Sequence, residues 1–173
     1  MSDKDSSASA GARGSKVVFE RTYRARVGEL WKLWTTKEGF ESWWGPEGFR
    51  AEVYTLEAHV GGILHYDMIA DAPAQIAAMK QLGRPTTHEA HARFTEYRPL
   101  ERLAITTVID FLPGVKPYES TMVVEFFRSG ENGENVRIVV TLDPMHDEET
   151  TRMSTLGFTS QLTKLETRFG GPE

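Results

Sequence analysis

Apolar and polar residues alternate along Lys16–Arg26, which gives this segment two unlike faces. Such a two-residue period predicts a β-strand. The period then changes, because the apolar residues of Val27–Thr36 recur at the three- and four-residue spacing of an amphipathic helix. Lys37–Trp44 keeps the helical spacing until Gly45 and Pro46 end it. We therefore expect two short helices directly after the first strand.

The middle of the chain is dominated by β-strand patterns. Its connectors are mostly short and rich in Gly and Pro, which favours an antiparallel meander. One connector, Asp71–Pro85, is longer, and its apolar residues predict an inserted helix of about two turns, which serves either as a lid or simply as a long loop. The expected strands are Phe49–Val60, Ile63–Ala70, His88–Arg98, Leu103–Leu112, Tyr118–Arg128 and Asn135–Leu142.

The longest helical pattern comes last, over Asp147–Phe169. Acidic residues occupy its first turn and basic residues its last turns, as the helix dipole favours. Its apolar residues cover more than one narrow stripe, so we expect a curved sheet to surround it. The order of elements predicts one α+β domain over residues 16–173. The Ser-, Ala- and Gly-rich residues 1–15 are expected to form a disordered tail.

Composition narrows the function classes. The chain has 173 residues, of which 39% are hydrophobic and 26% charged, as in a compact domain. The net charge of −5 argues against a nucleic-acid partner, and the lack of cysteine removes thiol catalysis and cysteine zinc sites. No apolar stretch approaches the roughly 20 residues of a membrane span, and no secretory signal precedes the domain. We therefore expect a cytoplasmic protein without a membrane span.

Several blocks of sequence resemble one known family. Val27–Thr36, followed by Phe40–Pro46, resembles the N-terminal signature of the START-like (SRPBCC) superfamily. Within it, the chain is most similar to the group related to the C-terminal domain of the activator of the ninety-kilodalton heat-shock protein ATPase. The Val60–Gly62 turn and the Phe94–Pro99 block resemble further parts of that group in the same order. Leu156–Phe158 lies where the group usually has Gly-Trp, and Phe replaces Trp here.

This resemblance, over about residues 16–169, implies a helix-grip fold, in which an antiparallel sheet wraps around the C-terminal helix. It also implies a cavity between the two, where the superfamily binds lipids, sterols, polyketides or other apolar molecules. It implies no cofactor. Our first hypothesis is a non-catalytic binder of an apolar or aromatic molecule. A cyclase, dehydratase or hydrolase using the same cavity comes second. A cochaperone that activates a chaperone ATPase comes third, because the activator's separate N-terminal domain has no counterpart in this sequence.

Candidate cavity residues follow from residue type and position. Trp43 and Trp44 are adjacent on a helix, so we expect one to pack in the core and the other to line the cavity mouth. His65 is a candidate polar anchor, with a surface position as the alternative. Asp110 lies among apolar residues, where a buried carboxyl could support acid–base chemistry; otherwise it is solvated. The full set of candidates is Trp34, Trp43, Trp44, Phe49, His65, Met68, Phe94, Asp110, Met122, Met153, Gly157 and Phe158.

The histidines do not predict a metal site. His88 and His91 are three residues apart in a strand, so they point to opposite faces and cannot share an ion. His59 and His65 flank the Gly61 turn, but no third ligand is evident. Motifs of serine hydrolases, phosphate-binding loops and zinc proteases are absent from the sequence. We expect neither a bound metal nor a residue with an assignable catalytic role.

Overall fold

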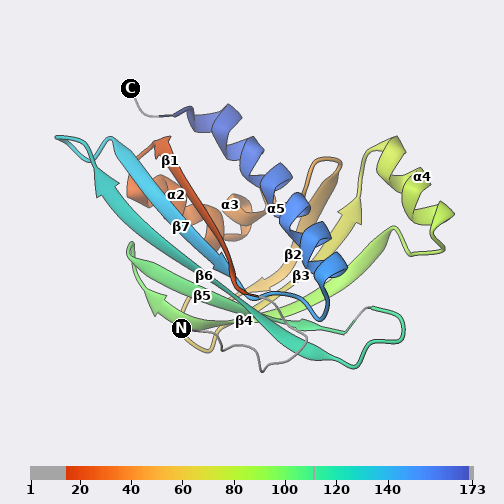
Figure 1. Cartoon of the computed structure of the whole chain (residues 1–173). Coiled ribbons are helices and arrows are strands. Elements are labelled where there is room, and N and C mark those ends of the chain that lie inside the picture. Colours follow the sequence, from red (N-terminus) through yellow and green to blue (C-terminus); the bar gives the residue numbers. More distant parts are fainter. Residues whose placement is uncertain (1–14, 111, 172–173) are drawn as a thin grey trace.

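A computed structural model describes residues 15–110 and 112–171. Seven strands form one antiparallel sheet in the order β1-β7-β6-β5-β4-β3-β2, and the sheet curls around a long C-terminal helix, α5 (Figure 1). The strands are β1 Val17–Arg24, β2 Phe49–Leu56, β3 Ile63–Ala70, β4 Thr87–Arg98, β5 Arg102–Ile109, β6 Tyr118–Ser129 and β7 Asn135–Leu142. The helices are α2 Val27–Thr35, α3 Lys37–Glu41, α4 Pro73–Gln81 and α5 Glu148–Phe169.

The predicted fold class and order of elements are confirmed. Two short helices follow the first strand, a helix interrupts the β3–β4 connection, and the sheet is antiparallel throughout the described residues. The differences lie at element ends. The expected strand Phe49–Val60 ends at Leu56, because the Glu57 and His59 backbones make a tight turn before β3. The tail expected over residues 1–15 falls, except for Ser15, outside the described residues.

The two ends of the concave face are filled differently. At one end, α2 places Trp31 against Phe126 of β6, with 5.2 Å between ring centroids. Trp34 packs edge-on against Trp43 at 4.8 Å, and both are almost fully buried. This aromatic cluster explains why the tryptophans gather around α2 and α3, since each large ring removes much apolar surface from water.

At the other end of the concave face, α5 alone covers the sheet. All of its buried residues lie from Phe158 onward, where Phe158, Leu162 and Leu165 pack against the sheet. The residues before Phe158 include none that is buried, and Met153 and Leu156 are more than half exposed. The helix is therefore anchored by one half, while the other half spans the sheet without filling the space beneath it.

Helix α4 has little contact with the rest of the protein. It contains no buried residue, and Figure 1 shows it standing apart, beyond the ends of β3 and β4. Its main tether is at its start, where the backbone amides of Asp71 and Ala72 donate to the Gly48 carbonyl at 2.8 and 3.1 Å. The insertion is thus an appended helix rather than part of the core.

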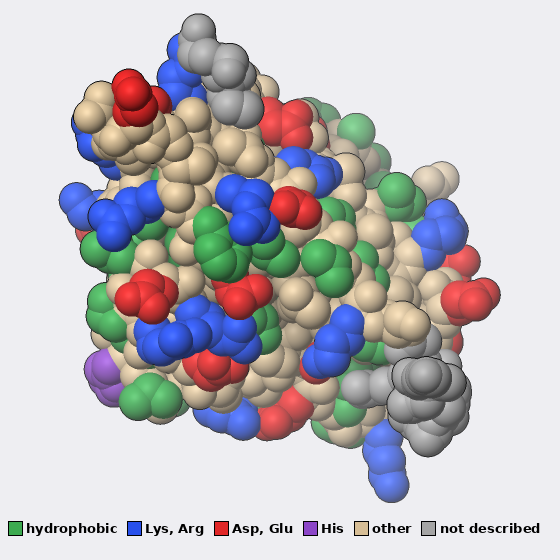
Figure 2. All heavy atoms as spheres, turned by 60° about the vertical axis from the view of Figure 1, so that its left-hand side comes forward, with side chains coloured by type: hydrophobic (Ala, Val, Ile, Leu, Met, Phe, Trp, Pro, Cys, Tyr) green, Lys and Arg blue, Asp and Glu red, His purple; other side chains and the backbone are tan. Residues whose placement is uncertain are grey.

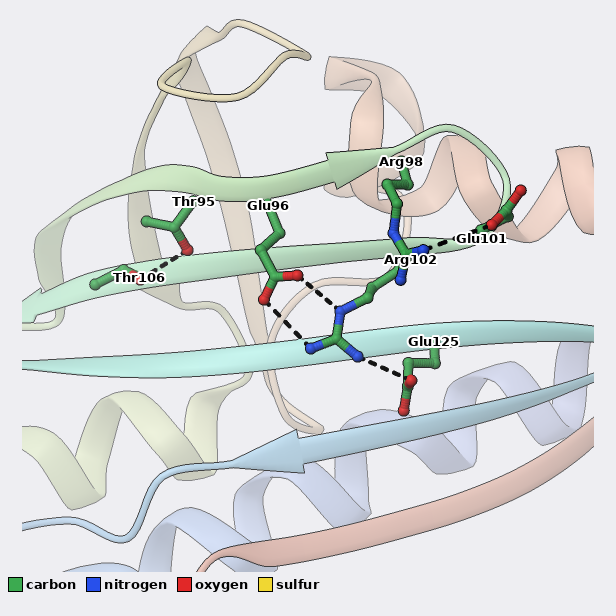
Figure 3. A network of polar contacts seen from close by, with 7 residues as sticks. All are labelled: Thr95, Glu96, Arg98, Glu101, Arg102, Thr106 and Glu125. Carbon is green, nitrogen blue, oxygen red and sulfur yellow. Dashed lines mark hydrogen bonds and ion pairs between the residues drawn. The ribbon is translucent and has the colours of Figure 1, made fainter.

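The outer face of the sheet is covered by charged pairs. Arg102 lies between Glu96 and Glu125, each with an N–O distance of 2.8 Å (Figure 3). Arg93 pairs with Glu119 at 2.9 Å. Acidic and basic side chains are interspersed in the space-filling view as well (Figure 2). These partners neutralise the two arginines, so neither offers a free positive charge to an anionic ligand.

Candidate functional site

A pocket of about 270 Å³ lies between the sheet and the middle of α5. Strand alternation builds its floor, because every second residue of neighbouring strands faces the helix. The alternating residues of the floor are Tyr66 and Met68 of β3, His88 and Ala90 of β4, Thr107 and Ile109 of β5, Ser120 and Met122 of β6, and Leu142 of β7; Thr121 of β6 also borders the pocket, although its hydroxyl contacts Thr106 on the outer face. Ser154, Gly157, Phe158 and Gln161 of α5 form the roof, and Trp44, Pro46, Asp143 and Met145 close the sides.

The pocket has a simple origin in the sequence. Phe126 and Met122 lie on the same strand and face, but the α2 tryptophans reach only the Phe126 end. At the Met122 end, α5 presents Gly157, and a Cβ built on Gly157 meets no atom within 4 Å. The lack of a side chain there leaves space between the helix and the floor.

Five of the twelve candidates from the sequence line this pocket: Trp44, Met68, Met122, Gly157 and Phe158. Trp44 and Trp43 face different ways. The Trp43 indole Nε1 donates to the Leu33 carbonyl at 3.0 Å and packs in the core, whereas Trp44 borders the pocket. The sequence predicted that one of these two adjacent tryptophans packs in the core and the other lines the cavity, but it did not indicate which one does which.

The other seven candidates lie elsewhere. Trp34, Trp43 and Phe94 are buried in the core away from the pocket, and Phe49 is half-buried at the start of β2. Met153 is 56% exposed on the outer side of α5.

His65 and Asp110 also lie outside the pocket lining. His65 pairs with His91 on the outer face of the sheet, 4.6 Å between ring centroids, because β3 turns Tyr66 rather than His65 toward α5. Asp110 follows the end of β5 and is exposed, so the apolar residues around it in sequence do not bury it.

The first polar group of the pocket wall that sequence reasoning missed is Tyr66. Its hydroxyl accepts a hydrogen bond from the Trp44 indole Nε1 at 3.0 Å. Burial raises the pKa of Tyr66 to about 12, so the hydroxyl keeps its proton at neutral pH. The available signal was the strand face that Tyr66 shares with Leu64 and Met68, which is more apolar than the face of His65.

The second missed group is His88, near the start of β4. Burial lowers its pKa below the ordinary value of 6.5, and the charges of the Asp67 and Asp110 carboxylates partly oppose this. The imidazole is therefore neutral at pH 7. The spacing of His88 and His91 did place them on opposite faces, but the sequence did not say which one faced inward.

Gln161 ties the roof to the side wall. Its side chain is 4% exposed, and its Oε1 accepts a hydrogen bond from the Gly45 backbone amide at 3.1 Å. The Nε2 of the same amide is buried without a hydrogen-bond partner. The Ser160 hydroxyl accepts from the Glu47 amide at 2.9 Å, so α5 holds the segment after Trp44 at two successive points.

The pocket lining carries little charge. Asp143 is its one carboxylate; it pairs with Lys16 at 2.7 Å and accepts from the Thr121 amide at 2.9 Å. Among the described residues, no Lys or Arg lines the pocket. Within the described chain, no three side chains of the His, Asp or Glu type come together as metal ligands would. Nor does any described helix have the length and apolar character needed to cross a membrane.

A curled antiparallel sheet, a long C-terminal helix held in its concave face and a pocket between the two define a START-like, or SRPBCC, protein of the helix-grip type. Residues 24–170 match the family described as activator of Hsp90 ATPase homolog 1-like protein. The chain belongs to this family, and the resemblance noted in the sequence is confirmed.

Solved structures agree on the fold. A protein from Chromobacterium violaceum has a TM-score of 0.67 at 15% identity, over 92% of this chain and 100% of its own. The AHSA1 protein from Silicibacter pomeroyi has a TM-score of 0.67 at 18% identity, over 89% of this chain and 96% of its own. The AHSA1-like protein from Aeromonas hydrophila has a TM-score of 0.62 at 14% identity, over 88% of this chain and 90% of its own. At these identities the likeness shows the fold alone. No curated protein matches the chain.

Proposed function

We propose that the chain binds a small, mainly apolar or aromatic molecule in the pocket between the sheet and α5. The observation that carries this proposal is the pocket itself, since the surface of its walls is largely apolar and polar side chains of the sheet and of α5 border the same space. The apolar walls are Trp44, Met68, Ala90, Ile109, Met122, Leu142, Met145 and Phe158. Apolar pockets with a few placed polar groups are the usual form of small-molecule sites.

The size of the pocket limits the ligand. A buried apolar cavity of about 150 Å³ holds a benzene molecule. The volume of about 270 Å³ here is less than twice as large, which suits one or two rings or a comparable branched chain. A long-chain lipid or a sterol would need the pocket to open further, so compact aromatic or polyketide-like molecules fit better.

A catalytic function in the same pocket is the second candidate, and His88 favours it. A neutral imidazole can accept a proton, and Tyr66 on the neighbouring strand can donate one to a substrate oxygen. In this case the retained molecule would be converted during incubation. The Asp110 carboxyl, considered from the sequence as an acid–base group, plays no part in this candidate because it lies outside the lining.

Native mass spectrometry of the freshly purified protein tests binding directly. A stoichiometric passenger, extracted and identified, would support the proposal, and its conversion with time would favour catalysis. A thermal-shift series follows, because a ligand at 100 times its Kd stabilises the fold by about 2.7 kcal/mol.

A matched pair of variants locates the binding. Gly157→Leu places a side chain into the open space above the pocket floor. Gly28→Leu is the matched control, because it adds the same side chain to a helical glycine of α2 that also has open space around it but lies outside the pocket lining. Ligand stabilisation should disappear in Gly157→Leu and persist in Gly28→Leu. Equal stabilisation of both variants would show that the ligand binds elsewhere and would contradict the proposal.

A further inference from the structure

Two polar side chains of the pocket have their acceptor atoms occupied by the same short segment, Trp44–Gly45. The Trp44 indole donates to the Tyr66 hydroxyl at 3.0 Å, and the Gly45 amide donates to Gln161 Oε1 at 3.1 Å. An indole N–H and a backbone N–H can only donate, so the direction of both hydrogen bonds is fixed. Each of the two side chains also carries a donor that neither of these hydrogen bonds uses.

Neither remaining donor has an acceptor among the described residues. Gln161 Nε2 is buried without a partner, and the Tyr66 hydroxyl makes no hydrogen bond other than the one it accepts from Trp44. Tyr66 is only 7% exposed, and both residues line the pocket. A buried donor without an acceptor is unfavourable, so a ligand atom that accepts from it gains affinity.

The charge of the lining decides which acceptor fits. A carboxylate or phosphate brought into the pocket would lose its hydration and meet no Lys or Arg among the lining residues. A neutral carbonyl oxygen accepts hydrogen bonds with the same geometry as a carboxylate oxygen, and its burial costs far less hydration free energy.

We propose that the pocket selects neutral carbonyl compounds of about one or two rings, with Tyr66 donating to the carbonyl oxygen and Gln161 providing a second donor beside it. This inference rests on the proposed function, because it names the ligand class of the same pocket. Compact ketones, esters, lactones and quinones belong to this class, whereas fatty acids and other organic anions do not.

Three probes of similar size test the selectivity: the ketone 1-tetralone, its hydrocarbon tetralin and the carboxylate 1-naphthoate. Each is titrated into the full-length protein, and the Kd is measured by chemical shifts in NMR spectra. We expect the ketone to bind about two- to tenfold more tightly than the hydrocarbon, the range that one net hydrogen bond supplies, and the carboxylate to bind most weakly.

The variants must allow for Trp44, because Tyr66→Phe alone frees the indole N–H to replace the lost donor. We therefore compare Trp44→Phe with the double variant Trp44→Phe/Tyr66→Phe. The first should keep the full preference for 1-tetralone over tetralin, and the second should have a smaller preference, because only Gln161 then remains as a donor. Tyr54→Phe, at an exposed tyrosine of β2, serves as the control that keeps the wild-type ratio.

A second measurement does not depend on the variants folding. The infrared carbonyl stretch of ¹³C-labelled 1-tetralone should have a lower frequency in the wild-type complex than in an alkane solvent, because the carbonyl oxygen accepts a hydrogen bond only in the complex. Equal Kd values for ketone and hydrocarbon, an unshifted carbonyl stretch, or tightest binding of 1-naphthoate would each overturn the inference while leaving the proposed function in place. Binding of none of the three probes would overturn both.

Discussion

The Lys164 ammonium of α5 donates to the backbone carbonyl of Gly45 at 2.7 Å. Gly45 has a φ of 110°, a conformation that other residues rarely adopt, and it directly follows Trp44 at the side of the pocket. Because Gln161 holds the amide of the same glycine, α5 grips both polar groups of one residue. The position of Trp44, and hence of the pocket wall, depends on this contact between helix and turn.

Lys164→Met should therefore affect both stability and binding. It removes a charge-assisted hydrogen bond, so we expect the free energy of unfolding to fall by about 1–2 kcal/mol and ligand affinity to fall as Trp44 loosens. Urea unfolding and ligand titration measure the two effects. Lys80→Met, at an exposed position of α4, is the control that changes neither. An unchanged affinity in Lys164→Met would show that Trp44 is held without this contact.

His88 predicts a pH dependence of stability. Burial makes its folded-state pKa lower than its unfolded-state value near 6.5, so the unfolded chain binds more protons between these two values. The His88 contribution is favourable above pH 6.5 and is lost as the pH falls toward the lowered pKa. Urea unfolding at pH 7.5 and 5.5 measures this loss, and His88→Asn should reduce it. The same substitution at exposed His59 should leave it as in the wild type.

The secondary structure could be predicted from the sequence more completely than the residues of the pocket could. Period and turn chemistry predicted the elements, because alternation on a strand and three- to four-residue spacing on a helix follow from backbone geometry. The end of α3 at Glu41 rather than Trp44 shows the limit, since local spacing continues past the point where the chain turns.

The pocket residues were harder to predict, because their direction depends on long-range register. Alternation grouped His65 with Asp67 and Tyr66 with Met68, but it could not say which group faced inward. That choice is made by pairing with β4 and by the packing of α5 over the sheet. Gln161 was missed for a similar reason. A polar residue on a helix gives no signal of its burial in the sequence, because the burial comes from the distant turn at Gly45.

The outer face provides a prediction that separates stability from binding. Arg102 bridges Glu96 and Glu125 on the side of the sheet opposite to the pocket (Figure 3). Arg102→Met should lower the free energy of unfolding by about 1 kcal/mol or less, since partly exposed ion pairs contribute little and are screened by salt. Ligand affinity should not change. A loss of affinity without further loss of stability would show coupling through the sheet.

The two halves of α5 should differ in local stability. Phe158, Leu162 and Leu165 anchor the C-terminal half, whereas the half from Glu148 to Gly157 has no buried residue. Segments with few buried apolar contacts open more easily, so backbone amides of residues 152–157 should exchange with deuterium faster than those of residues 161–166. A ligand in the pocket fills the space beneath the N-terminal half and should slow its exchange most.

Hydrogen exchange followed by NMR, with and without 1-tetralone, measures both effects. The variant Gly157→Leu supplies the comparison, because its side chain fills part of the same space without a ligand. In that variant the N-terminal half should already be protected and respond little to 1-tetralone. Uniform exchange along the whole of α5 would mean that this half of the helix is held by something other than packing on the sheet.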